Sequence, residues 1–139
     1  MSDFVLDASV TLAWFVDRPV APYAARVRQA LANGGRATVP ALWRVEVPNG
    51  LVVAERRGIL SPSDTTLAVQ KLELLLSQSI DSAAESVSLR RVLSSARQYR
   101  LTAYDACYLD LAREQRLPLA TLDRRLREAA LLAGVGLLS

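Results

Sequence analysis

The sequence has no histidine and only one cysteine, Cys107. The first absence excludes acid–base chemistry through an imidazole, and the two together exclude a zinc site built from the usual cysteine and histidine ligands. A lone cysteine cannot form an internal disulfide, which is consistent with a reducing compartment. Any reactive chemistry is therefore expected to depend on oxygen ligands, chiefly carboxylates.

Long apolar runs are absent as well. The longest, such as residues 129–136, fall far short of the roughly 20 residues that span a bilayer. No basic region precedes the apolar stretch near the N-terminus, as a secretory signal would require. We therefore expect neither membrane insertion nor secretion, and a cytoplasmic location.

Lysine is nearly absent, since Lys71 is the only one and arginine supplies the remaining positive charge. The formal net charge is +3 and the isoelectric point about 9.5, a modest excess that favours an anionic partner because a planar guanidinium suits phosphate. The 139 residues are 51% hydrophobic and 22% charged, which is typical of a globular chain. We expect residues 1–139 to form a single domain.

Short apolar segments alternate with longer amphipathic segments along the chain. Strands are predicted at residues 4–6, 37–39, 117–122 and 134–138. Helices are predicted at about 10–16, 22–33, 40–57, from 61 onward, 82–99, 103–115 and 124–133. Strands separated by helices pair in parallel, so the sequence predicts the α/β class, with a three-layer α/β/α sandwich around a central parallel sheet.

Four acidic residues, Asp7, Glu46, Asp105 and Asp123, stand in apolar surroundings, where a carboxylate is costly unless it is paired or bound to a cation. Asp7 and Asp123 follow predicted strands directly, so both should point into the crevice at the carboxyl ends of the sheet. Asp105 opens a helix, whose dipole favours a negative charge. Mg²⁺ and similar hard cations prefer such oxygen ligands.

Other interpretations of these acids stay open. An aspartate after a strand is often only a helix cap, so Asp7, Asp105 and Asp123 could each be structural. Glu46 lies within a predicted helix on a face of mixed polarity, and this pattern is equally typical of a solvent-facing glutamate. Asp110 is about 140° around the helix from Asp105 and is interpreted as a surface residue near Arg113, or at best as a group that lies behind the residues of the site.

Small polar residues accompany three of the acids. Ser9, Asn49 and Thr121 are suited to fixing a carboxylate or a water molecule by hydrogen bonding. Four arginines lie close to the acids in sequence and could contact phosphates, although they could equally be solvent-facing: Arg44, Arg124, Arg125 and Arg127.

Four sequence blocks carry a family resemblance: FVLDAS at 4–9, PALWRVEVPNGL at 40–51, LTAYDACYL at 101–109 and LATLDRRL at 119–126. In this order they resemble a PIN domain, and more closely a VapC toxin of a type II toxin–antitoxin system, over essentially the whole chain. The resemblance implies a Mg²⁺- or Mn²⁺-dependent endoribonuclease with a sheet of order 3-2-1-4-5. It also implies a homodimer and a cognate antitoxin whose peptide tail occupies the active-site groove.

Carried over by position, the resemblance makes Asp7, Glu46, Asp105 and Asp123 the catalytic acids, with Ser9, Asn49 and Thr121 in support. On our hypothesis Asp7 and Asp123 bind the metal directly, Asp105 binds it directly or through water, and Glu46 orients the attacking water. One residue departs from the family pattern: Pro48 stands where a helix former is usual, and a proline inside a helix costs about 3 kcal/mol or more. Such a proline allows a kink near Glu46, so the role of Glu46 is the part of the resemblance that this departure puts in question.

Three rival interpretations remain. The first is a non-catalytic PIN-like module that binds RNA or protein. The second is a phosphotransferase with Asp7 as the nucleophile, although phosphatases of the haloacid dehalogenase type carry a second aspartate two residues on, where this chain has Ser9. The third is a structural protein in which the acids only cap helices.

Overall fold

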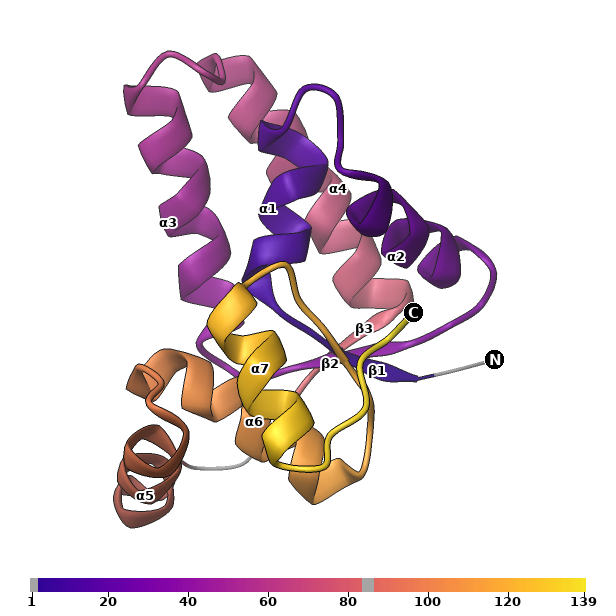
Figure 1. Ribbon diagram of the computed structural model, residues 1–139. Helices are drawn as coiled ribbons and strands as arrows, with labels where there is room; N and C mark the ends of the chain where they lie inside the picture. The colour runs from indigo at the N-terminus through magenta and orange to yellow at the C-terminus, as the bar shows by residue number, and fades with distance from the viewer. Residues whose placement is uncertain (1–2, 84–86) are drawn as a thin grey trace.

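A four-stranded parallel sheet forms the centre of the molecule. The computed structural model describes residues 3–83 and 87–139 (Figure 1). The strands are β1 (Phe4–Leu6), β2 (Ala37–Val39), β3 (Ile80–Ser82) and β4 (Leu119–Ala120), in the order β3-β2-β1-β4. In the register, Phe4 lies beside Ala37 and Val5 beside Leu119. β1 is central and all three of its residues are buried, because both faces of a parallel sheet are covered.

Helices cover both faces of this sheet. Their bounds are α1 Ala8–Val16, α2 Pro22–Ala32, α3 Trp43–Arg56, α4 Pro62–Gln78, α5 Leu89–Tyr99, α6 Ala103–Gln115 and α7 Arg124–Leu132. Figure 1 shows α1 to α4 on one side of the strands and α6 and α7 on the other, with α5 outside α6. The predicted three-layer α/β/α architecture is therefore confirmed.

The core joins the strands to the helices through large apolar side chains. Phe4, Leu6, Trp43, Tyr108 and Leu109 are almost completely buried, and each such side chain stabilises the fold by about 1.5 to 3 kcal/mol. The indole of Trp43 also donates a hydrogen bond from Nε1 to Oγ1 of the buried Thr11, at 3.2 Å. This contact fixes the start of α3 against α1. None of the helices in the described parts of the chain combines the length and the apolar character needed to cross a membrane.

The predicted helix over 82–99 is wrong at its start. Residues 80–82 form the edge strand β3, which pairs with β2, and α5 begins only at Leu89, after its capping residue Ser88. Ile80 is the only buried residue of β3, so the segment has no apolar alternation that would reveal a strand. The part of that prediction that falls on residues 84–86 lies outside the described residues.

The predicted strand at 134–138 is reduced to one parallel bridge between Leu137 and Leu119. Two backbone hydrogen bonds hold it, from Leu119 N to Gly136 O and from Leu138 N to Leu119 O, both 2.9 Å long. The segment thus occupies the place beside β4 where a fifth strand was expected. The order of the four complete strands agrees with the expected 3-2-1-4.

Candidate active site

Asp7 lies where β1 ends, and it is only 4% exposed. Its Oδ2 accepts hydrogen bonds from Ser9 Oγ at 2.5 Å and from Thr121 Oγ1 at 2.7 Å. Burial raises the pKa of Asp7, the two hydroxyls partly oppose that shift, and the charge of Asp123 adds to it. The carboxylate is thus held in one orientation at the carboxyl edge of the sheet, under conditions that favour a cation beside it.

The hydroxyls of Ser9 and Thr121 tie the ends of β1 and β4 together. The two oxygens lie 3.3 Å apart. Ser9 Oγ accepts from the backbone of Leu122, and Thr121 Oγ1 accepts from the backbone of Asp123, each at 3.0 Å. Thr121, two residues before Asp123, therefore donates to Asp7 from the end of the neighbouring strand β4.

Asp105 lies in the first turn of α6, where its backbone N–H donates to the capping hydroxyl of Thr102 at 3.1 Å. The pKa of Asp105 is raised to about 6, first by burial and then by the charges of Asp123, Asp7 and Glu46. Carboxylates raise one another's pKa only when they lie close together. The four acids therefore lie close enough to repel one another, and a bound cation would relieve that repulsion.

Asp123 has two structural relations at once. Its Oδ1 accepts from the backbone of Leu126 at 2.9 Å, so the carboxylate caps α7 as an ordinary N-cap residue does. The same side chain lines the pocket described below. The interpretation of Asp123 as a helix cap is therefore correct but incomplete.

Glu46 lies in the first turns of α3, two residues before Pro48. The helix continues from Trp43 to Arg56 through the exposed Pro48, which leaves the carbonyl of Arg44 without its usual partner inside the helix. The side chain of Glu46 nevertheless reaches the other acids, and its Oε1 accepts a hydrogen bond from Tyr108 Oη at 2.7 Å. Burial raises the pKa of Glu46, Tyr108 lowers it and Asp7 raises it.

Tyr108 is the site residue that sequence reasoning missed. It lies three residues after Asp105, so both side chains project from the same side of α6. The three-residue spacing from Asp105 was the signal in the sequence that could have placed Tyr108 at the site. Its ring is fully buried, and its hydroxyl is the contact that holds Glu46 at the pocket across the gap between α6 and α3.

The four acids line one open pocket of about 300 Å³. Its remaining lining residues are Ala8, Ser9, Leu12, Asn49 and Gly50. At Gly50 a β-carbon would meet the side chain of Leu12, so the glycine leaves room for this leucine of α1 to pack against α3 beside the pocket. The structure thus brings Asp7, Glu46, Asp105 and Asp123 together, with Ser9 and Asn49 among them and Thr121 behind Asp7.

The donor set fits a hard divalent cation in its chemistry. All charged donors are carboxylate oxygens, and Mg²⁺ is commonly held by one or two carboxylates while it keeps several waters. Within residues 3–83 and 87–139, no three Asp, Glu, Cys or His side chains lie close enough together to hold an ion by themselves. An ion in this pocket would therefore be bound partly through water molecules.

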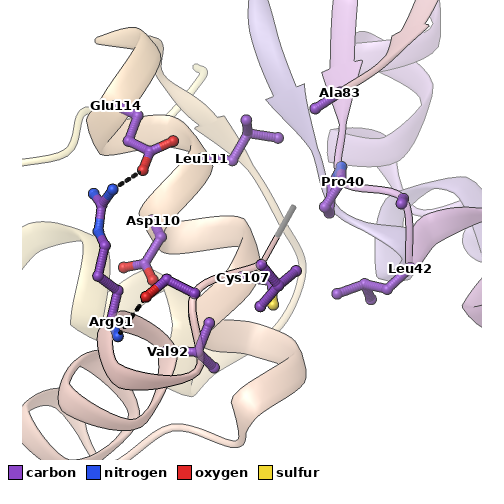
Figure 2. Close-up of a pocket in the computed structure, with 12 residues that line it drawn as sticks. Pro40, Leu42, Ala83, Arg91, Val92, Cys107, Asp110, Leu111 and Glu114 are labelled. Carbon is purple, nitrogen blue, oxygen red and sulfur yellow. Dashed lines mark hydrogen bonds and ion pairs between the residues drawn. The ribbon is translucent and has the colours of Figure 1, made fainter. Parts of the chain in front are cut away.

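Asp110 takes no part in this pocket. Figure 2 shows Asp110 among the residues that line a second pocket. Its Oδ1 accepts a hydrogen bond from Ser95 Oγ at 2.6 Å. The prediction of a surface residue near Arg113 is wrong, because α5 packs against this face of α6 and partly buries Asp110. Cys107 lines the same second pocket, and burial raises the pKa of its thiol, which disfavours the reactive thiolate.

Two of the four arginines near the acids have partners within the chain. Arg127 donates to the carbonyl of Thr121 at 2.9 Å and lies over the ring of Tyr23, with 5.2 Å from Cζ to the ring centroid. Arg124 pairs with Glu128 at 3.3 Å. Arg44 and Arg125 are exposed, and Arg44 makes only a 3.3 Å contact with Ser82 Oγ. Arg127 therefore has a structural role within the chain, while the phosphate contacts considered for all four arginines stay predictions.

A parallel α/β domain with acidic side chains gathered at the carboxyl ends of its strands defines the class of this protein. The chain belongs to the PIN domain family, whose family model matches residues 4–132. PIN domains are generally nucleases and typically use divalent metal ions.

Several solved structures are similar to this chain, among them the following two. PAE2754 from Pyrobaculum aerophilum has a TM-score of 0.69 and 26% sequence identity, over 92% of this chain and 84% of that one. FitAcB from Neisseria gonorrhoeae has a TM-score of 0.60 and 18% identity, over 98% and 96% of the two chains, and its likeness concerns the fold alone. No curated protein sequence matches the chain.

Proposed function

We propose that the protein is a Mg²⁺- or Mn²⁺-dependent endoribonuclease, and the VapC-type toxin of a type II toxin–antitoxin system. The convergence of Asp7, Glu46, Asp105 and Asp123 on one pocket, in a member of the PIN family, is the observation that carries the proposal. The raised pKa of Asp105 supports it, because the charges of the other three acids contribute to that shift.

The residues divide the work according to their positions. Asp7 and Asp123, at the ends of β1 and β4, bind the cation directly, while Asp105 binds it directly or through water. Ser9 and Thr121 hold the Asp7 carboxylate in place. When bound, the cation supplies Lewis-acid polarisation of the phosphodiester and offsets charge on the leaving oxygen.

Glu46 orients the attacking water. Its carboxylate is held by Tyr108, and its pKa is raised by burial, which makes it a better proton acceptor than an exposed glutamate would be. The chain has no histidine to take this part. Asn49, which lines the pocket three residues after Glu46 on α3, is suited to hydrogen-bond the same water or the substrate.

The biological setting follows from the family resemblance. A single domain spanning residues 1–139 would act in the cytoplasm as a homodimer, and a cognate antitoxin would neutralise it by placing a peptide tail in the pocket. Apolar side chains are exposed on two segments that are candidates for the dimer surface: Leu67 and Leu74 of α4 are 54% and 57% exposed, and Leu131 and Leu132 of α7 are 66% and 79% exposed.

Cleavage of RNA tests the proposal. Wild-type protein with Mg²⁺ should cut a labelled RNA within the strand, and both EDTA and the Asp7→Asn substitution should abolish cutting. Asp110→Asn is the matched control, because that carboxylate lies in the other pocket, and it should retain activity. Equal cleavage under all of these conditions would mean a contaminating nuclease or a different site.

A non-catalytic PIN module is the second candidate. The observation in its favour is that no three acidic side chains of the described residues already lie at metal-binding distance from one another. Calorimetric titration with Mn²⁺ separates the two functions. The nuclease should bind Mn²⁺ in a manner that depends on Asp7 and Asp105, whereas the module should bind RNA or protein without it.

A further inference from the structure

Helix α5 carries an unusual concentration of positive charge. The helix and its C-cap contain Arg90, Arg91, Arg97 and Arg100 and no acidic residue, for a formal charge of +4. The whole chain carries +3, so the remainder is slightly negative. This one helix therefore carries more positive charge than the net charge of the whole chain.

The outward face of α5 forms a stripe of hydrogen-bond donors. The helix packs against α6, and Ser95, which donates to Asp110 of that helix, is its only buried residue. On the opposite side lies a shallow, open depression, whose lining residues define the α5 stripe: Arg90, Leu93, Ser94, Arg97 and Gln98. Arg90 and Arg97 are seven residues apart, so their side chains leave the same face at two points roughly 10 Å apart.

Within residues 3–83 and 87–139, the two guanidinium groups of the stripe have no acidic partner. Arg91 pairs with Glu114, as Figure 2 shows, but no carboxylate in the described parts of the chain lies within 4.0 Å of Arg90 or Arg97. Arg90 also stands in the first turn of α5, where the helix dipole disfavours a cation. An arginine at an unfavourable end of a helix, with no described partner that offsets the cost, is typical of a residue that serves binding.

The C-terminal end of α5 lies close in sequence to a residue of the acidic pocket. α5 ends at Tyr99, and only residues 100–102 separate it from α6, which carries Asp105 in its first turn. The pocket itself holds four carboxylates and repels phosphate groups until a cation is bound. Affinity for a polyanion must therefore come from surfaces outside the pocket.

We propose that the α5 stripe binds the phosphodiester backbone of the RNA that enters the acidic pocket; this inference rests on the proposed ribonuclease function. Two guanidiniums, one hydroxyl and one amide present donors along a shallow, exposed track, which is the chemistry of sequence-independent backbone contacts. An acidic peptide fits less well, because peptide recognition relies on pockets that bury apolar anchors and Leu93 is the only apolar residue of the stripe.

Binding of RNA in EDTA tests the inference separately from cleavage. The probe is a fluorescently labelled single-stranded RNA of mixed sequence, and its anisotropy is followed over a series of salt concentrations. The test variant is Arg90→Gln/Arg97→Gln. The control is Arg56→Gln/Arg57→Gln, which removes the same charge from the exposed end of α3, far from α5 in Figure 1. Circular dichroism should show both variants folded, since all four side chains are exposed.

Loss of two phosphate contacts should reduce the slope of log K against log salt by about 1.4, which is about 25-fold weaker binding near 0.1 M salt. Arg90→Lys/Arg97→Lys should keep most of the slope, and the α3 control should change it far less than the test variant. Equal losses in the α3 and α5 variants would reduce the effect to net charge and overturn the assignment. So would a glutamate-rich peptide that binds as tightly as RNA with the same dependence on Arg90 and Arg97.

Because EDTA prevents metal-dependent cleavage, these results do not depend on the nuclease reaction. A protein that fails to cut RNA with Mg²⁺ but binds it through the stripe would contradict the proposed catalysis alone. A protein that cuts RNA but binds it equally well without Arg90 and Arg97 would contradict the stripe alone.

Discussion

Removal of one hydroxyl, in Tyr108→Phe, isolates the contribution of the contact that positions Glu46. Tyr108 Oη lies 2.7 Å from Glu46 Oε1, and the ring is fully buried, so phenylalanine keeps the packing and deletes only the hydrogen bond. Because Glu46 is partly accessible and water can replace the lost donor, the free energy of unfolding should fall by about 1 kcal/mol rather than by the full value of a buried bond to a charged group.

The effect of Tyr108→Phe on cleavage should exceed its effect on stability. Without its donor, Glu46 is free to leave the position from which it orients water, and we expect cleavage with Mg²⁺ to slow by about tenfold, or about 1.4 kcal/mol in the barrier. The hydrogen bond lowers the pKa of Glu46, so its loss should also move the acidic limb of the pH–rate profile to higher pH. Initial rates on a labelled RNA over a pH series measure both changes.

A double-mutant cycle decides whether Tyr108 acts through Glu46. If it does, Glu46→Gln/Tyr108→Phe should cut RNA no more slowly than Glu46→Gln alone. Tyr104→Phe is the control, since Tyr104 lies on the same helix and is 65% exposed, and it should change neither rate nor stability. Additive losses in the cycle, or a Tyr108→Phe enzyme with wild-type rates at every pH, would refute the reasoning.

Three further predictions concern stability measured by urea unfolding in EDTA. The pKa of Asp105 is about 6 in the folded protein and 3.8 ordinarily, so between these values the folded state binds a proton that the unfolded state has lost. The free energy of unfolding should therefore fall as pH rises from about 4 to about 6. Asp105→Asn should remove about 1 kcal/mol of that fall, since the group is half exposed and screened. Thr121→Val deletes a buried donor to Asp7 and should cost about 1 to 3 kcal/mol, and an unchanged midpoint would contradict the contact. Arg90→Gln should raise the free energy of unfolding by about 0.3 to 1 kcal/mol and Arg97→Gln should lower it, because the two residues lie at opposite ends of the α5 dipole. Equal effects of the two substitutions would exclude the helix dipole as the cause.

The position of Asp7 could be predicted from the sequence because its environment is set locally. Residues 4–6 are continuously apolar, a run that is typical of a strand buried on both faces, and a residue after such a strand must face the carboxyl edge of the sheet. The same argument, from the apolar residues before it, placed Asp123 at the carboxyl edge of the sheet. Asp105 followed from a helix start signalled by Thr102.

The contacts across the sheet could not be predicted, because they depend on how distant segments pack. Thr121 reaches Asp7 only because β4 pairs with β1, and Tyr108 reaches Glu46 only because α6 and α3 meet at the pocket. The sequence does not report either distance. The effect of Pro48 on Glu46 likewise could not be predicted from the sequence. Pro48 interrupts the hydrogen bonds of α3, but Tyr108, on another helix, holds Glu46 at the pocket.

The elements at the edges of the fold, β3 and α5, were also predicted wrongly from the sequence. β3 has one buried residue and owes its conformation to pairing with β2, so its own three residues carry little strand signal. The side of α6 that carries Asp110 was assigned to solvent because nothing in the sequence states that α5 folds back over it. In both places a neighbour in space overrides the local preference.

Anomalous diffraction from crystals grown with Mn²⁺ tests most directly whether the four acids form a metal centre. The account predicts an anomalous peak inside the pocket, in contact with Asp7 and Asp123 and linked to Asp105 directly or through water. The peak should disappear in crystals of Asp7→Asn and persist in those of Asp110→Asn. A pocket without a peak at saturating Mn²⁺, or a peak that survives Asp7→Asn unchanged, would contradict the account.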